Sequence, residues 1–143
     1  MSTITAANSI FFLSAVGLYN VPVQMQGYAA DDAFASEEVE FGEAVIGVDR
    51  KASFGYTPYL TPLDFTLQAD SASILIMEAI IAAEKAAGEK IILNATIILP
   101  SIGRIYAFST GGLMKGPVGP SAGKVLKPRK YALTFQDLSA APV

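Results

Sequence analysis

The chain has 143 residues, of which 52% are apolar and only 16% are charged. This length suits one domain with a buried core, and the apolar share excludes intrinsic disorder because burial can offset the entropy of ordering. The absence of Cys and His removes disulfides, thiolate nucleophiles, the commonest metal ligand and the usual general base. We therefore expect no enzymatic activity, no cofactor and no metal site, and we expect other chains to cover part of the surface.

Charge is segregated along the chain, although the formal net charge is only −3. Residues 1–49 contain seven acidic residues and no basic one, whereas residues 90–143 contain seven basic residues and one acidic residue. Such asymmetry is typical of a nucleic-acid-binding tail, or of a chain whose acidic part meets the basic part of another copy.

The apolar stretch from Ile4 to Val23 does not have the pattern of a membrane segment. No Lys or Arg precedes Arg50, so the basic flank of a signal peptide is missing. Polar residues and Pro22 interrupt the stretch, whereas a spanning helix needs about 20 mostly apolar residues. We expect a buried strand at 10–16 and no stable membrane insertion.

The pattern predicts a single domain over residues 1–143 that begins with a flexible N-terminal arm (1–9). Alternating apolar and polar residues indicate half-buried strands. The clearest example places Leu63, Phe65 and Leu67 on one face. The elements expected before residue 70 are strands at 10–16 and 19–28, an acidic loop at 27–36, strands within 37–48, a turn at 47–51 and strands within 52–69.

One helix is predicted from Asp70 or Ser71, which can cap it, to Ala87, with Gly88 ending it. Its apolar residues spread around most of the circumference, which is typical of a buried helix. A helix sunk between two sheets of its own chain explains this pattern, and so does a contact with a second subunit. The residues predicted for such a subunit contact are Ile74, Met77, Ile80 and Ile81.

Strands follow at 90–99, 102–108 and 130–136, and a long Gly/Pro/Lys loop is expected at 111–130. Long loops without secondary structure in compact domains are usually functional or disordered. The predicted fold class is mainly β with one α-helix: a β-sandwich or half-barrel of antiparallel strands plus one flanking helix.

The short motifs of the chain do not indicate a small-ligand site. Gly119 to Lys124 lacks the spacing of a phosphate-binding loop. The basic run Lys124–Lys130 has only Tyr131 beside it as an aromatic residue, which weakly supports nucleic-acid stacking. Polar faces of the predicted strands are more informative, since Gln and Thr dominate them where solvent-exposed faces usually carry Lys and Glu. These rows suit the wall of a water-filled pore, and the residues predicted to face its lumen are Gln24, Gln26, Asp64, Thr66, Gln68, Thr134 and Gln136.

Several segments carry a resemblance to a known family. Gly27–Phe34 (GYAADDAF), Glu37–Glu40 and Val45–Arg50 are followed by the alternating strand Leu63–Gln68 and by the helix opening at Asp70–Ser73. In these segments and their order, the chain resembles the tail tube proteins of contractile-tailed bacteriophages.

The resemblance implies a structural subunit that oligomerises into a ring-shaped β-barrel. Six subunits would form a ring, and rings would stack into a tube inside a contractile sheath. The tube would conduct DNA into the host. The implied partners are other copies of the chain, the tail sheath protein, and the tape-measure protein and DNA passing through the lumen without sequence recognition. The implied location is the virion tail, after synthesis in the host cytoplasm.

Head-to-tail stacking predicts that acidic residues of one ring lie near basic residues of the next. The residues predicted for this inter-ring interface are Asp31, Asp32, Glu37, Glu38, Glu40, Glu43, Lys115, Lys124, Lys127, Arg129 and Lys130. Two alternatives stay open: another ring-forming component of a contractile injection machine (a tube initiator, terminator or secretion-tube protein), or a small β-sandwich binding or enzyme domain.

Overall fold

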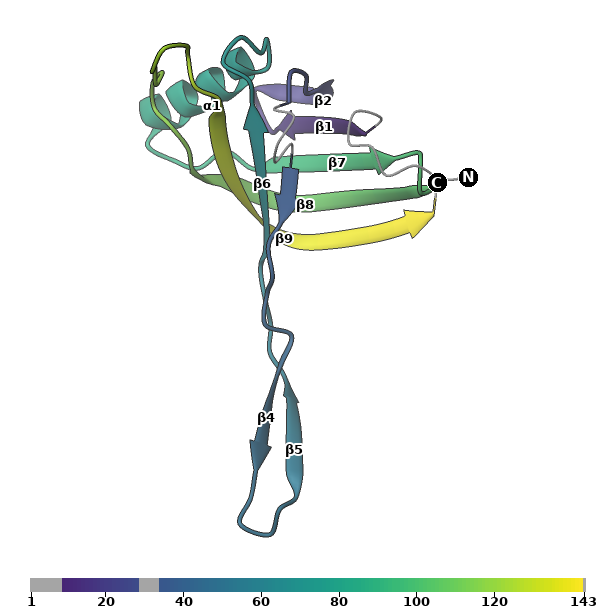
Figure 1. The fold of residues 1–143 in the computed structure, drawn as a ribbon. Coiled ribbons are helices and arrows are strands. Elements are labelled where there is room, and N and C mark those ends of the chain that lie inside the picture. The colour runs from purple at the N-terminus through teal and green to yellow at the C-terminus, as the bar shows by residue number, and fades with distance from the viewer. Residues whose placement is uncertain (1–8, 29–33, 143) are drawn as a thin grey trace.

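The computed structural model describes residues 9–28 and 34–142. Within these residues the chain forms nine strands and one helix (Figure 1). The elements are β1 (Ile10–Ala15), β2 (Tyr19–Gln24), β3 (Phe34–Ser36), β4 (Gly42–Ile46), β5 (Ala52–Tyr56), β6 (Thr61–Leu67), α1 (Ile74–Ala87), β7 (Leu93–Leu99), β8 (Arg104–Lys115) and β9 (Arg129–Pro142).

Seven of these strands form one antiparallel sheet in the order β2-β1-β7-β8-β9-β6-β3. In Figure 1, β1, β2, β7 and the long strands β8 and β9 run side by side across the body, and β6 crosses their direction. Between β7 and β8 and between β8 and β9 the register shifts, and Thr110 of β8 has a left-handed backbone with φ of 53°. These irregularities accompany the bend that turns the sheet into a half-barrel.

The core lies on the concave face of this sheet. Alternate residues of the strands point into it, as the two-residue period requires. The predicted apolar faces of β6 and of the first half of β9 are confirmed, since the three alternating apolar residues of each are completely buried. They are Leu63, Phe65 and Leu67 of β6 and Tyr131, Leu133 and Phe135 of β9.

Helix α1 closes the core with one apolar stripe rather than with its whole circumference. Ile74, Met77 and Ile80 are buried at helical spacing, whereas Leu75 is 69% exposed and Ile81 is half-buried. The prediction of a helix buried all round is therefore wrong. The three buried residues belong to the chain's own core, so they are not available for a contact with a second subunit.

The ends of α1 are partly as expected. Gly88 adopts the left-handed conformation with φ of 70° and ends the helix, as predicted. The start differs, because α1 begins at Ile74 and Ser73 makes no side-chain cap. The Ser73 hydroxyl instead accepts a hydrogen bond from the Gln26 N–H, at 2.7 Å, and so ties the helix to the turn after β2.

Other boundaries shift by several residues. Strand β8 continues to Lys115 and β9 starts at Arg129, so the predicted 111–130 loop shrinks to 116–128. The predicted 27–36 loop contains the short strand β3. The mainly-β fold with one helix and antiparallel strands is confirmed, whereas the predicted N-terminal arm (1–9) lies almost wholly outside the described residues.

Candidate assembly surfaces

A long hairpin leaves the body between β3 and β6 and forms a second, two-stranded sheet (Figure 1). We call residues 40–56 the β4–β5 hairpin. Its strands pair from Gly42 opposite Tyr56 to Ile46 opposite Ala52. The Gly47 N–H donates to the Lys51 carbonyl at 3.0 Å and the Arg50 N–H donates to the Gly47 carbonyl at 2.9 Å, which closes the turn.

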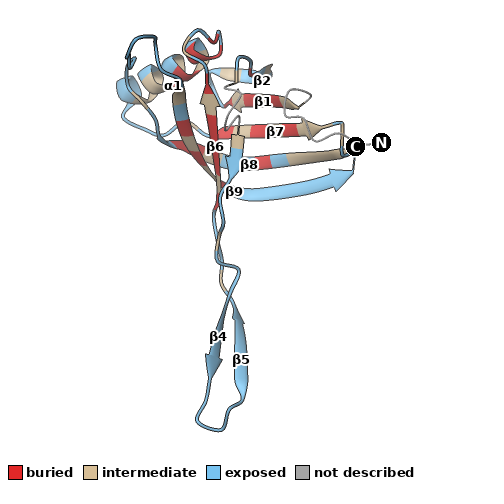
Figure 2. Ribbon diagram, viewed as in Figure 1, coloured by how far each residue is buried: buried red, intermediate tan, exposed pale blue. Residues whose placement is uncertain are grey.

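Every residue of the β4–β5 hairpin is exposed, and Figure 2 shows the hairpin without a buried position. Several of these exposed side chains are nevertheless large and apolar: Phe41, Val45, Ile46, Val48, Phe54 and Tyr56. An isolated two-stranded hairpin is marginal in water, and contiguous exposed apolar surface marks interaction sites. The hairpin therefore has the properties of a segment that is completed by another protein surface.

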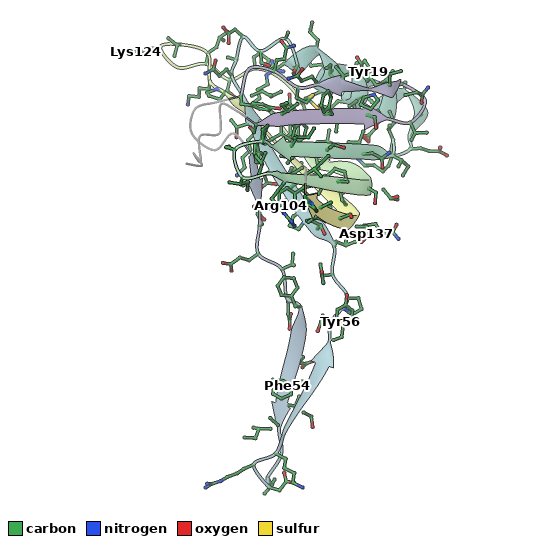
Figure 3. The ribbon with its side chains drawn as sticks, turned by 90° about the vertical axis from the view of Figure 1, so that its right-hand side faces the viewer. Tyr19, Phe54, Tyr56, Arg104, Lys124 and Asp137 are labelled. Carbon is green, nitrogen blue, oxygen red and sulfur yellow. The ribbon has the colours of Figure 1, made fainter. Side chains whose placement is uncertain are left out.

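The opposite end of the molecule carries the 116–128 loop, and Figure 3 shows Lys124 far from Phe54 and Tyr56. The loop contains a small turn in which the Gly123 N–H donates to the Val125 carbonyl at 2.9 Å. The Lys127 N–H donates to the Ser121 carbonyl at 2.8 Å. Lys124 and Lys127 are both exposed, and they form no ion pair with any residue that the structure describes.

At the root of the hairpin lies a cluster that we call the charged hollow, formed by Glu37, Asp64, Lys115 and Lys130. Asp64 is buried on β6, and its Oδ2 lies 3.8 Å from the Lys130 Nζ. A hydrogen bond with Asp64, together with repulsion between the two carboxylates, raises the pKa of Glu37. The hollow joins the hairpin root to β6, β8 and β9 through charges of one chain.

A second internal ion pair fixes the start of β9. The Arg129 Nη1 lies 2.7 Å from the Glu78 Oε1 of α1, and the Arg129 side chain is only 12% exposed. The hydrogen bond with Glu78 raises the pKa of Arg129. Arg129 thus holds the helix against the sheet within the chain.

The predicted inter-ring residues consequently divide into three groups. Glu37, Lys115, Arg129 and Lys130 lie in or beside contacts within the chain. Asp31 and Asp32 lie outside the described residues. The exposed remainder, without ion pairs to any described residue, is Glu38, Glu40, Glu43, Lys124 and Lys127.

The residues predicted to face a lumen do not share one surface. Asp64 and Thr134 face the charged hollow, and Thr66 lies opposite Lys130 on that side of the sheet. Gln136 lines a hollow beside the hairpin root, and Gln68 lies near the 116–128 loop at the other end. Gln26 is exposed in the turn after β2.

Only Gln24 lies on the broad face of the five strands that run side by side. The register places it in one row across the sheet, on the face that points away from the core. This uncharged row consists of Gln24, Phe12, Thr96, Ala107 and Ser139. Sequence periodicity could not join these residues, because they come from five strands and only the pairing register aligns them.

No helix in the described part of the chain is long and apolar enough to cross a membrane.

Solved structures with a similar fold come from contractile particles. A chain of the tube and sheath terminator of an extracellular contractile injection system (PVC) superposes with a TM-score of 0.64 at 8% identity, covering 99% of this chain and 98% of that one. A chain of the anti-feeding prophage baseplate gives a TM-score of 0.62 at 11% identity, covering 100% and 99%. A chain of the PVC sheath–tube complex gives 0.60 at 9% identity, covering 100% and 93%.

At these identities the likeness concerns the fold, which is the fold that the resemblance to tail tube proteins implied. None of the curated protein sequences compared with the chain matches it. A family model, described as tail fiber protein gp32, matches residues 2–139, which is nearly the whole chain. The chain therefore belongs to the tail fiber protein gp32 family, and it is a tail protein with a tube-like fold.

Proposed function

We propose that the chain is the subunit of a tail tube, assembling into stacked six-membered rings inside a contractile sheath and conducting DNA. The observation that carries this proposal is the β4–β5 hairpin, which projects exposed apolar side chains from one end of a body with a tube-like fold (Figure 2). A hairpin at one end and its acceptor at the other form a heterologous contact, which repeats without closing and builds a stack.

Within a ring, the free strand edges supply the second contact. β2 is the last strand at one side of the seven-stranded sheet. Residues 137–142 of β9 pair with β8 only, so their other edge is unpaired among the described residues. An exposed edge is a template for another strand, and ring closure removes it. Pairing of β2 with this part of a neighbour's β9 would continue the sheet around the ring.

The uncharged row of Gln24, Phe12, Thr96, Ala107 and Ser139 would then face the channel. Phosphate groups bind chiefly to Lys and Arg, so a wall without these residues lets DNA and a tape-measure protein pass without retention. The sheath protein would contact the outside of the same tube. Of the predicted contacts between the acidic 31–43 region and the basic loop of the next ring, those of the exposed Glu38, Glu40 and Glu43 with Lys124 and Lys127 remain part of the proposal.

Negative-stain microscopy of the purified chain tests the proposal directly. Tubes or stacked rings with a central channel are the expected result. A monomer over a wide concentration range would overturn it, and so would thin filaments without a channel, which fit a fibre instead. Discrete rings that never stack would favour the second candidate, a tube initiator or terminator; a chain in a solved sheath/tube terminator structure has a similar fold.

Charge reversal separates the ionic contribution from folding. K124E/K127E changes exposed residues only, so the fold should be retained while tube assembly weakens. Adding R129E would instead break the pair with Glu78 and destabilise the chain itself. Tubes of unchanged stability in K124E/K127E would exclude these lysines from the ring contact.

A further inference from the structure

The end of the molecule opposite the hairpin carries a shallow groove, which we call the loop groove. It lies between the turn that joins β6 to α1 and the small turn of the 116–128 loop. Its lining is mostly apolar, and the residues are Gln68, Ala69, Asp70, Ala122, Gly123, Lys124, Val125, Leu126 and Pro128.

The apolar side chains of the loop groove are held out toward solvent by the structure around them. Val125 is 77% exposed and Leu126 is 58% exposed. The backbone bonds of the small turn and an isolated bridge between Ala122 and Leu126 fix the segment that presents them. On the other side, the Gln68 N–H donates to the Gly27 carbonyl at 2.8 Å, which fixes the β6–α1 turn. Both walls are ordered by hydrogen bonds while their apolar side chains remain uncovered.

We propose that the loop groove is the acceptor for the β4–β5 hairpin of a second copy of this chain, with Ile46 of the hairpin packing against Val125 and Leu126. This inference rests on the proposed stacking function and specifies the surface through which stacking occurs. Both partners expose aliphatic side chains, and they lie at opposite ends of the molecule (Figure 3). A contact between them therefore joins two copies end to end.

Charge complementarity supports the second copy as the occupant. Lys124 lines the groove and Lys127 lies in the same loop, and the β4 side of the docked hairpin would bring Glu40 and Glu43 toward them. The groove also carries the exposed Asp70, while the hairpin tip carries Arg50 and Lys51. Opposite charges at both edges fix the orientation and suppress wrong docking more than they add affinity.

The remaining basic residues near the loop do not compete for this role. Arg129 is paired with Glu78, and Lys130 lies near Asp64. Lys115 lines the charged hollow near the hairpin root and not the loop groove. Lys124, which lines the groove, and Lys127 are therefore the basic residues of the 116–128 loop, and both are exposed without an ion pair to a described residue.

The native chain contains no Cys, so introduced thiols report the contact without background. I46C/L126C is purified, concentrated and treated with a short bis-maleimide crosslinker, and the products are resolved by denaturing electrophoresis. Because each copy carries one thiol at each end, we expect a ladder of dimers, trimers and longer chains. A mixture of the single variants I46C and L126C should stop at dimers.

I46C/L75C is the matched control, since Leu75 is as exposed as Ile46 but lies on α1. Proximity raises the effective concentration of two thiols, so we expect at least about tenfold more linked product from I46C/L126C than from the control. A charge exchange in the I46C/L126C background gives an independent readout. The additional substitutions K124E/K127E should abolish the ladder of crosslinked products, and combining them with E40K/E43K should restore that ladder.

The outcomes separate the inference from the function on which it rests. Tubes in the microscope without an I46C/L126C ladder above the control would overturn the loop groove as the acceptor while leaving the tube function standing. A ladder without tubes or rings would support the contact and overturn the tube function. Absence of both would overturn both, and a ladder in tubes supports both.

Discussion

Substitution of Ile46 by Ser should abolish or strongly weaken self-assembly without affecting the folded chain. Ile46 is 68% exposed on a hairpin that lies outside the core, so its removal should change the free energy of unfolding by less than about 0.5 kcal/mol. Full burial of such a side chain is worth about 1.5–3 kcal/mol, so burying the exposed two-thirds gives about 1–2 kcal/mol per copy.

This magnitude has a measurable consequence for assembly. A loss of about 1–2 kcal/mol per copy changes an equilibrium by a factor of about 5–30, and the critical concentration for tube formation should rise by that factor. If six-membered rings dock as units, six hairpins act together and the loss per ring interface reaches about 6–12 kcal/mol. Sedimentation of assembled material at a series of concentrations measures the first quantity, and micrographs of stacked against single rings report the second.

L75S is the control because Leu75 is equally exposed, at 69%, and also aliphatic, but lies on the outer side of α1. It should leave both the unfolding midpoint and the critical concentration unchanged. If I46S and L75S assemble equally well, the hairpin contributes no apolar contact between copies and the reasoning fails. If I46S lowers the unfolding midpoint of the monomer, Ile46 contributes to the fold of its own chain, which also contradicts the reasoning.

Three further substitutions test the fold itself. G27A should lower the free energy of unfolding by about 1–3 kcal/mol, because Gly27 has φ of +71° and the new Cβ would lie 2.6 Å from the Ser71 Oγ. G17A is the control for the backbone strain alone, since Gly17 has φ of +86° but no atom near the new Cβ. Equal losses of stability in urea unfolding would show that the contact with Ser71 is unimportant. Y28F should move alkaline unfolding to higher pH: burial raises the pKa of Tyr28, so above about pH 10 only the unfolded chain ionises there and stability falls as pH rises. M77A should cost about 2–5 kcal/mol, since Met77 is fully buried where α1 meets the sheet, and a smaller loss would mean that the core collapses around the gap.

The sequence alone determined the class of the fold and much of its local structure. Period-two alternation in β6 and β9 identified the buried faces, since a strand with one face on a core must place its apolar residues at every second position. Gly88 was identified as the end of the helix because it adopts a left-handed backbone at little cost. These features depend on neighbours within a few residues, so the local pattern was sufficient.

The tertiary structure decided which apolar residues are covered. Val45 and Ile46 look like core residues in the sequence, yet they lie on a hairpin with no layer packed against it. In α1 the pattern suggested burial all round, whereas the sheet covers one stripe and leaves Leu75 in solvent. The apolar character of a side chain indicates that its burial is favourable. Only the arrangement of the sheet and helix determines whether this chain or another one provides the covering surface.

The same limit applies to charge and to the proposed channel wall. Segregated acidic and basic residues indicated contacts between copies, but the fold pairs Arg129 with Glu78 and brings Lys130 near Asp64 within one chain, and leaves Lys124 and Lys127 unpaired among the described residues. The uncharged row through Gln24 and Thr96 exists only because antiparallel register aligns distant segments. Ion pairs and sheet faces depend on which segments become neighbours in space, and a one-dimensional pattern does not contain that information.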